Sequence, residues 1–439
     1  MAEARSTSRS AMKTAIRTLN ALPVCHSLRG MTAPGNCHLV GGGLRDAVLG
    51  VPPCDIDVVI SGRGRAISQA LADEYATRMI ELGGDRFAAF RLAVGDLQID
   101  IWDRRDSTLT SDLLRRDLTI HSFALDIHDG TLADPFSGLE DLAQGTLRMT
   151  SPDSFANDPL RILRLCRFAA QLPDFQIEPH TLEQATRSTS ELTNIASERI
   201  RSEIETTLRQ PRADIAALLW IRLGVFPDAL LGEVSDLQHR QQLVSDVTKA
   251  FTVLDQTAGK VPARTDLLIA HIAVLLRLLG LSLGREDTEI ADHLWSQGYL
   301  TKSVFRRVSR ILGSTPPPGD APGQRWFLHS MGDDWSAAVC LVAGIHAIEV
   351  GSNSDLSGMP LEITPLVEQA TKHGAEIFDP PRLVTGRDLQ LELNLAAGPE
   401  LGRILATIRR RQIEGGVATR EQALVLARRL ISDWPPSSD

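Results

Sequence analysis

Short apolar runs that alternate with polar residues mark the first part of the chain, mixed with helical segments. Phe87–Val94 and Leu97–Trp102 show the alternation of half-buried strands, and Ala93–Asp96 has the composition of a hairpin turn between them. Phe123–Ile127 predicts another strand, which leads into a turn. Residues 1–150 therefore predict an α/β or α+β arrangement.

Beyond about residue 150 the strand signals nearly vanish and a helical period replaces them. Asp158–Leu172 predicts a strongly amphipathic helix, and the Asp-Pro pair at its start suits a helix N-terminus. Ser197–Gln210 predicts a second helix, with Ser197 as its cap. The Pro- and Gly-rich stretch Ser314–Gln324 predicts a loop or hinge. Further helical patterns cover 214–226, 266–281 and most of 351–439.

Composition and charge limit the classes of partner. The chain has 439 residues, of which 43% are hydrophobic, enough for a sizeable core and for about three domains or one elongated multi-part protein. Lys and Arg number 46 against 55 Asp and Glu, a formal net charge of −9. This balance argues against a generic nucleic-acid coat, so any polyanion must meet a local basic surface.

Cysteine spacing and hydropathy address the compartment. The five cysteines are scattered without CxxC spacing, which argues against a zinc site or a disulfide framework and favours a reducing compartment. The chain has no run of about 18 apolar residues, and its N-terminus lacks an apolar core followed by a cleavage site. We therefore expect a cytoplasmic protein with no membrane partner.

The stretch Leu39–Ile60 combines three features that suggest chemistry. A short apolar run ends in three consecutive glycines, and a helix-like segment, Leu44–Gly50, follows with Arg45 in its first turn. An apolar strand then carries Asp55 and Asp57. The order is therefore glycine turn, helix start with an arginine, and a strand with two acids.

The two acids share one face of their strand because alternate side chains point the same way, with Ile56 on the opposite face. Two neighbouring carboxylates repel and raise each other's pKa unless a cation lies between them. Mg²⁺ takes few protein carboxylates plus substrate phosphates, and glycines let backbone N–H groups approach a phosphate. The stretch predicts a metal–nucleotide site, with a glycine turn beside a solvated edge strand as the alternative.

Further candidates lie downstream. Asp100 is on a strand that could lie beside the acid pair, where it is a third carboxylate of a two-metal cradle or a solvent-facing acid. Arg115 and Arg116 precede an apolar strand, and their forks suit triphosphate oxygens or line a solvated rim. His121 is a candidate nucleotide contact or a satisfied core residue.

The helix predicted at 158–172 carries a row of polar side chains, namely Asp158, Arg161, Arg164 and Arg167. An aspartate accepts from an exocyclic amine and an arginine donates to ring nitrogens or carbonyls, so such a pair can read a base edge. The alternative is an i,i+3 ion pair that stabilises the helix by roughly a few tenths of a kcal/mol. Three arginines within two turns of a proline-marked helix start favour the functional interpretation.

Taken together, these motifs resemble one family. GGGLRD with DID, then RRDLTIHSFA, DPLRILRLCRFAA and ERIRSE, are similar in order and spacing to the motifs of class II tRNA nucleotidyltransferases and bacterial poly(A) polymerases. The resemblance extends to the C-terminus through Leu383–Leu389 and Gly398–Leu405. It is weakest between about residues 211 and 350.

The resemblance implies an α+β fold in which a polymerase-β-like nucleotidyltransferase head precedes an all-helical neck, body and tail. The corresponding ranges are 1–150, 151–210, 211–350 and 351–439. It also implies an enzyme that adds C or A residues from CTP and ATP to the 3′ end of tRNA without a template. Catalysis would use two metal ions, with Mg²⁺ as the cofactor.

The resemblance assigns roles to residues as well. Asp55 and Asp57 match the metal-binding aspartates, and we add Asp100 as a candidate third catalytic acid. The nucleotide contacts match Gly42, Arg45, Arg116 with Arg115 beside it, Asp158, Arg161, Arg164 and Arg167. Among them, Asp158 and Arg161 match the amino-acid template that pairs with CTP or ATP. The motif that braces the template helix contains Glu198, Arg199 and Glu203.

The sequence departs from the family pattern at three places. Asn157 stands where a Glu usually precedes Asp158, and His121 stands where an Asn is usual. The segment between Asp100 and Arg115 is shorter than in CCA-adding members, which resembles CC-adding enzymes. Full CCA addition, CC-only addition, poly(A) polymerase activity and a non-catalytic RNA-binding relative all stay open, and so does the oligomeric state.

The C-terminal region contains the strongest candidate for a basic RNA-binding surface. Leu401–Gly416 carries Arg403, Arg409, Arg410 and Arg411. The same pattern is also typical of a solvated helix face. The RNA contacts of residues 211–350 are not indicated by the sequence.

Overall fold

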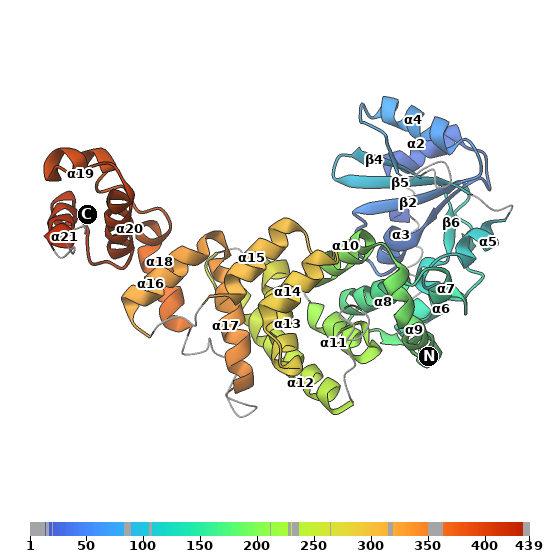
Figure 1. Ribbon diagram of the computed structural model, residues 1–439. Coiled ribbons are helices and arrows are strands. Elements are labelled where there is room, and N and C mark those ends of the chain that lie inside the picture. The colour runs from blue at the N-terminus through green and yellow to red at the C-terminus, as the bar shows by residue number, and fades with distance from the viewer. Residues whose placement is uncertain are drawn as a thin grey trace. The chain divides into compact units, whose positions relative to one another are not determined.

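The structure is a computed structural model that describes residues 14, 17–19, 21–82, 89–104, 108–210, 212–226, 230, 237–263, 265–314, 319–349 and 363–432. The chain divides into two compact units (Figure 1). Unit 1 comprises residues 1–196 and 223–225, and unit 2 comprises residues 197–222 and 226–439. The four-part division into head, neck, body and tail stays a prediction.

A mixed sheet forms the centre of unit 1. Within the described residues it has seven strands in the order β3-β4-β5-β2-β1-β6-β7, and only the β2–β5 pair is parallel. The strands are β1 (Cys37–Val40), β2 (Asp55–Ile60), β3 (Ile80–Leu82), β4 (Ala89–Val94), β5 (Leu97–Asp103), β6 (Ala124–Asp126) and β7 (Leu132–Ala133). The parallel pairing aligns Asp57 with Asp100, so the predicted neighbouring strands do lie side by side.

The strands confirm the period-two pattern, with shorter bounds in places. The β4–β5 hairpin turns at Gly95 and Asp96, as the sequence predicts. The N-terminal end of the strand predicted at Phe87–Val94 lies outside the described residues, and β4 begins at Ala89. The strand predicted at Phe123–Ile127 is reduced to β6.

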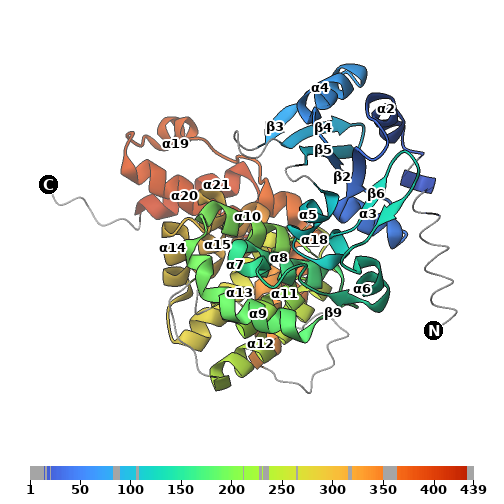
Figure 2. The same ribbon diagram turned by 90° about the vertical axis from the view of Figure 1, so that its right-hand side faces the viewer.

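Helices cover the sheet. Helix α2 (Pro23–Met31) packs on α4 (Gly64–Glu74), which lies against β4 and β5 (Figure 2). Helix α3 (Gly41–Val48) packs against β1, β2 and β6. The other short elements are α5 (Leu109–Leu114), η1 (Thr119–His121), α6 (Gly138–Gln144), β8 (Thr146–Leu147), α7 (Ser154–Asn157), β9 (Gln176–Ile177), α9 (Pro179–Ser188) and η2 (Thr189–Asn194).

The predicted amphipathic helix is α8 (Leu160–Gln171), with Pro159 at its N-cap and a continuous buried face. Its buried residues include Leu163, Cys166 and Ala170, as the sequence pattern indicates. The short β8–β9 pair is a small exception to the prediction that strands end near residue 150.

The prediction of a glycine turn before a helix from Leu44 is wrong. Helix α3 starts at Gly41, directly after β1, so the three glycines form its first turn. Gly41 has φ +76°, and a Cβ there would lie 2.0 Å from Asp57 Oδ2. A Cβ at Gly43 would lie 2.1 Å from the Asp55 backbone oxygen. Gly41 and Gly43 are therefore required because α3 approaches β2 too closely for a side chain at either position.

Unit 2 is built from helices. They are α10 (Ser197–Leu208), α11 (Ala213–Leu223), α12 (Leu237–Ala258), α13 (Leu267–Leu283), α14 (Asp287–Ser296), α15 (Lys302–Leu312), α16 (Ala321–Met331), α17 (Trp335–Glu349), α18 (Thr364–Phe378), α19 (Gly386–Leu393), α20 (Pro399–Ile413) and α21 (Arg420–Ser432). Helices α12, α13 and α17 pack against one another, and α19 to α21 enclose a separate apolar cluster around Leu389 and Ile404. The predicted helices are confirmed here.

Two sequence expectations meet the structure in unit 2. The loop predicted at Ser314–Gln324 is shorter, because α16 already begins at Ala321 with a proline in its first turn, where no backbone donor is needed. In the described part of the chain, no single helix is long and apolar enough to cross a membrane, although the bent pair α13–α14 passes by length and composition alone.

The glycine packing yields a prediction with a matched control. Gly43→Ala should lower the free energy of unfolding by about 2 kcal/mol or more, because the new methyl group collides with the backbone of β2. Gly42→Ala should change it by less than about 0.5 kcal/mol, since its Cβ would meet only Arg45 Nη2, at 3.9 Å. Urea unfolding of both variants measures the difference, and equal midpoints would contradict this packing.

Candidate active site

The two acids of β2 lie on one face of the sheet. Asp55 and Asp57 are partly exposed while Ile56 between them is 2% exposed. This alternation confirms the orientation expected from the strand period. Asp57 is paired in register with Val40 of β1 and Asp100 of β5, so it lies in the middle of the sheet rather than at an edge.

The electrostatics of Asp57 are those of a carboxylate without enough positive charge around it. Burial raises its pKa to about 6, and the negative charges of Asp55 and Asp100 contribute in the same direction. The charge of Arg116 and a hydrogen bond from the Gly42 amide lower the pKa but do not cancel the rise. Asp57 is therefore stabilised in its ionised form by any additional cation.

Asp100 has a partner of its own. Arg91 lies opposite it on β4 and donates from Nε and Nη2 to its two carboxylate oxygens, at 2.7 Å each. The Asp100 side chain is 13% exposed. In this arrangement both oxygens of Asp100 are engaged by a fork, which is the strongest geometry available to such a pair. The role of Asp100 as a third catalytic acid stays a prediction.

The donor set fits a hard divalent cation. Within the described ranges, no three or more His, Cys, Asp or Glu side chains are grouped as ligands of a metal ion. Asp55 and Asp57 nevertheless present hard oxygen donors on one face, and the pKa of Asp57 is raised to about 6. Mg²⁺ is commonly bound by one or two carboxylates together with substrate phosphates and water. Two carboxylates are thus sufficient for a site that a nucleotide completes.

Arg115 and Arg116, the first two residues of the RRDLTIHSFA motif, directly follow α5. Arg116 is near enough to Asp57 to lower the pKa of that carboxyl, and its Nη2 lies 3.7 Å from Asp112 Oδ2. Its Nε is buried without a hydrogen-bond partner. Arg115 is exposed, and its carbonyl oxygen accepts from Arg161 Nη2.

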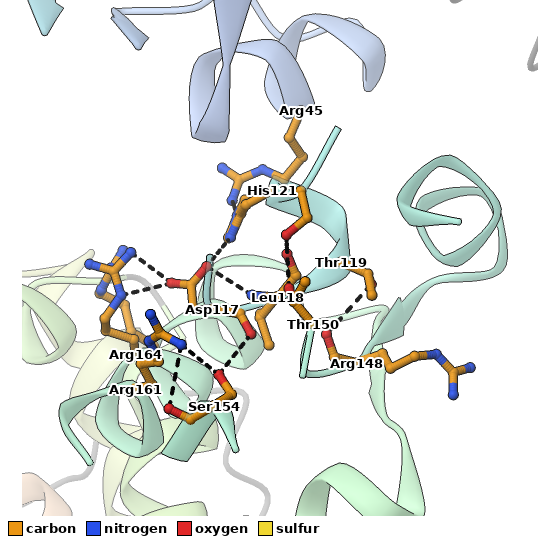
Figure 3. Close-up of polar contacts among 12 residues, drawn as sticks. Arg45, Asp117, Leu118, Thr119, His121, Arg148, Thr150, Ser154, Arg161 and Arg164 are labelled. Carbon is orange, nitrogen blue, oxygen red and sulfur yellow. Dashed lines mark hydrogen bonds and ion pairs between the residues drawn. The ribbon is translucent and has the colours of Figure 1, made fainter. Parts of the chain in front are cut away.

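Asp117, the third residue of that motif, is the centre of a buried polar network (Figure 3). Its Oδ1 lies 2.8 Å from His121 Nδ1, and its Oδ2 accepts from Arg164 Nε and Nη2 at 2.8 and 2.7 Å. Burial alone would raise the pKa of Asp117, but Arg164 and His121 hold it well below its usual range. Asp117 is therefore ionised and links α8 to η1.

The network continues into α3. His121 Nε2 lies 2.7 Å from Arg45 Nη1, and Arg45 also forms an ion pair with Asp46. Arg45 is 7% exposed, which is unusual for an arginine. Its guanidinium is accordingly paired with both His121 and Asp46. His121 is 5% exposed and both ring nitrogens have partners, which agrees with a satisfied core residue.

Phe168 of α8 forms the floor beneath this network. The guanidinium carbons of Arg45, Arg164 and Arg167 lie 5.7, 5.6 and 4.4 Å from its ring centroid. The His121 ring lies 4.4 Å from it in a tilted arrangement. Cation–π attraction to one ring therefore holds arginines from two separate elements close together.

The remaining predicted site residues, Asp158 and Arg161, form hydrogen bonds at the start of α8. Asp158 Oδ1 accepts from the Leu160 amide at 3.3 Å, just ahead of the helix. Arg161 Nη1 donates to Ser154 Oγ at 2.9 Å, and Ser154 Oγ lies 3.4 Å from the Asp117 carbonyl oxygen. The predicted site residues of α8 and of the second motif are thus brought together within unit 1.

Comparison with known proteins agrees with this geometry. Family models match the poly A polymerase head domain over residues 37–148, the probable RNA- and SrmB-binding site of polymerase A over 174–230, and domain 2 of tRNA nucleotidyltransferase over 372–427. A CC-adding tRNA nucleotidyltransferase of Synechocystis sp. is 26% identical over 90% of this chain and 94% of its own length. The multifunctional CCA protein of Azoarcus sp. is 32% identical over 63% of this chain and 69% of its own length.

The chain belongs to the class II tRNA nucleotidyltransferase family. It is therefore an enzyme of the nucleotidyltransferase class. The fold agrees: the Bacillus stearothermophilus CCA-adding enzyme in complex with CTP is 21% identical and superimposes with a TM-score of 0.71 over 96% of this chain and 98% of that chain. The α+β head followed by a helical remainder is thus confirmed for this nucleotidyltransferase.

Sequence reasoning on this nucleotidyltransferase missed three contributors. Asp117 is not among the predicted site residues, although it directly follows the arginine pair and that position is itself a signal. Arg91 is predicted only as part of a strand, yet an arginine nine positions from an acid across a hairpin is a detectable pairing. Phe168 looked like an ordinary core residue of the helix, and no local signal distinguishes it.

The arginines of α20 have partners inside the nucleotidyltransferase itself. Arg409 Nη1 donates to the Pro380 carbonyl oxygen, while Arg410 and Arg411 both form ion pairs with Glu414. Arg410 also lies over the Trp326 ring, at 5.1 Å. An RNA-binding role for this helix stays a prediction, and these contacts give at least Arg409 and Arg410 a packing role as well.

The raised pKa of Asp57 predicts how pH and a divalent cation affect stability. Its folded pKa of about 6 lies above the usual value of 3.8, so keeping it ionised costs stability as pH rises from about 4 to about 6. Without metal at about pH 7.5, Asp57→Asn should therefore raise the free energy of unfolding by about 2–3 kcal/mol. Added Mg²⁺ should stabilise the wild type more at about pH 7.5 than at about pH 5, where protons compete for the site.

Thermal unfolding with and without MgCl₂ at the two pH values measures these effects. Asp96→Asn, an exposed acid in the β4–β5 turn, serves as the control and should behave as the wild type. A metal-free Asp57→Asn protein that is less stable than the wild type at about pH 7.5 would contradict the assignment.

Proposed function

We propose that this nucleotidyltransferase adds cytidine residues from CTP to the 3′ end of tRNA, without a nucleic-acid template, and that it stops after CC. The observation that carries the proposal is the Asp55–Asp57 pair next to the glycine-rich start of α3, in the unit that also holds the Asp117 network. The names of the relatives, which include a CC-adding enzyme, support the choice of substrate.

The chain's residues would divide the work as follows. The backbone amides in the first turn of α3 would donate to a phosphate of the nucleotide, since a glycine-rich helix N-terminus binds anions. Arg45, Arg164 and Arg167 converge on one ring and would neutralise the triphosphate. Asp158 and Arg161 would pair with the edge of the incoming base.

Asp55 and Asp57 would hold a divalent metal ion, which we propose to be Mg²⁺ because it is commonly bound by one or two carboxylates together with substrate phosphates. When bound, such ions supply activation of a hydroxyl and neutralisation of phosphate charge. The oxygen of the tRNA 3′-hydroxyl would bond to the α-phosphorus, its proton would pass to solvent, and pyrophosphate would leave. The arginines would stabilise the negative charge that builds up on the leaving group.

Restriction to CC addition rests on the short connection between β5 and α5. Strand β5 ends at Asp103 and α5 begins at Leu109 after the Thr108 cap, so only five residues join them. The resemblance links a longer segment here to the switch from C to A addition. We therefore expect terminal A addition to be left to another enzyme. We also propose that the protein acts in the cytoplasm, on tRNA that lacks its CCA end.

Removing either acid should abolish activity while the fold is kept. Asp55→Asn and Asp57→Asn should each reduce CTP incorporation by at least about a hundredfold, because the site loses a ligand for the charge on the reacting phosphate. Asp96→Asn is the matched control and should retain wild-type activity. Incorporation at wild-type rates by purified Asp57→Asn protein would end this proposal.

The product ends distinguish the rival activities. A tRNA transcript without CCA, incubated with CTP, with ATP or with both and then sequenced at its 3′ end, should gain two C residues whenever CTP is present, and no A. A terminal A after CC would instead indicate full CCA addition, and long A tracts with ATP alone would indicate a poly(A) polymerase. Binding of tRNA without any incorporation would support a non-catalytic relative.

A further inference from the structure

The Asp117 network contains a group whose chemistry the proposed function does not use. His121 lies between α3 and α8, with Nε2 at 2.7 Å from Arg45 Nη1 and Nδ1 at 2.8 Å from Asp117 Oδ1 (Figure 3). Asp117 in turn accepts both hydrogen bonds from Arg164. A single chain of hydrogen bonds therefore runs from an arginine beside the glycine-rich helix start to an arginine on α8.

The donors and acceptors in this chain allow one arrangement of protons. A guanidinium can only donate, so the lone pair of His121 Nε2 must accept from Arg45. Nδ1 then carries the hydrogen and donates to the ionised carboxylate of Asp117. His121 is accordingly a neutral imidazole in the Nδ1–H form, and in this form it joins a donor-only neighbour to an acceptor-only one.

The surroundings hold the ring in that state. Its neighbours are the charged groups Arg45 with its partner Asp46, Asp117, Arg164 and Arg167, and the ring of Phe168. Burial lowers the pKa of His121, Asp117 opposes that change, and Arg45 and Arg164 add to it. A second proton would place an N–H against the Arg45 guanidinium and break the chain of hydrogen bonds.

We propose that His121 is a positioning residue for nucleotide binding. It fixes Arg45 relative to Arg164, because it accepts a hydrogen bond from Arg45 and donates one to Asp117. The Asp117 carboxylate in turn holds Arg164. This rests on the proposed function, because the two arginines are there assigned to the triphosphate. His121 does not touch the reacting atoms. Its effect should therefore appear in the affinity for CTP much more than in the rate of the chemical step.

Two substitutions separate positioning from simple core packing. His121→Gln keeps one acceptor and one donor on a planar group, so it should preserve the link between Arg45 and Asp117. His121→Leu is apolar and removes the hydrogen bonds to Arg45 Nη1 and Asp117 Oδ1. His128→Gln is the control, because His128 Nε2 lies 2.9 Å from Thr32 Oγ1 and His128 is outside the Asp117 network.

The measurements are the dissociation constant for CTP without tRNA, by calorimetry, and KM and kcat for CTP incorporation. His121→Leu should weaken CTP binding and raise KM by at least about tenfold with kcat within about threefold, whereas His121→Gln and His128→Gln should stay within about threefold of the wild type. Equal losses in the Leu and Gln variants, or unchanged CTP binding in a folded His121→Leu protein, would overturn the proposal.

A spectroscopic measurement covers the case in which His121→Leu does not fold. In protein labelled with ¹⁵N-histidine, the ring signals that His121→Gln removes should be those of a neutral ring with its hydrogen on Nδ1 at about pH 7.5. Signals of an imidazolium, or of the Nε2–H form, would overturn the proposal. A wild-type protein that binds CTP but adds no nucleotide would contradict the proposed function while the CTP-binding comparison still tests His121.

Discussion

The close approach of α3 to β2 is the constraint on which the rest of unit 1 depends. Gly41 and Gly43 touch the side chain of Asp57 and the backbone of Asp55 at distances that leave no room for a Cβ. The helix start therefore lies directly over the acid pair, and the Gly42 amide bonds to Asp57. This partly compensates the negative charge, yet the pKa of Asp57 is still raised to about 6, so the site retains an attraction for cations.

A second constraint follows from burying charge beside that helix. Arg45 points into the protein and must be paired there, because an unpaired buried charge is strongly destabilising. His121 and Asp117 supply the pairing and extend it to Arg164 on α8, and Phe168 provides the apolar surface beneath. Electrostatics and packing thus position the arginines that we propose as the triphosphate-binding residues of the nucleotidyltransferase.

The role of an acidic or basic residue cannot be predicted from its type alone, because its ion-pair partners also matter. Asp100 is aligned with Asp57 in the sheet, but Arg91 engages both of its oxygens, so the two acids differ in their need for a cation. In α20, Arg410 and Arg411 share Glu414. In a chain with net charge −9, the local partners of each arginine therefore decide how much of its charge is available to a polyanion.

By itself the sequence determined the strands and helices, the common face of Asp55 and Asp57, and the family, because periodicity and motif spacing depend on neighbours within a few residues. The partners of charged side chains were decided only by the tertiary structure. Arg45 and His121 are 76 positions apart and Asp117 and Arg164 are 47 apart, so no local pattern predicts their contact. The close packing of Gly41 and Gly43 against β2 was likewise decided only by the tertiary structure, because the atoms that leave no room for a Cβ belong to Asp55 and Asp57 on another element.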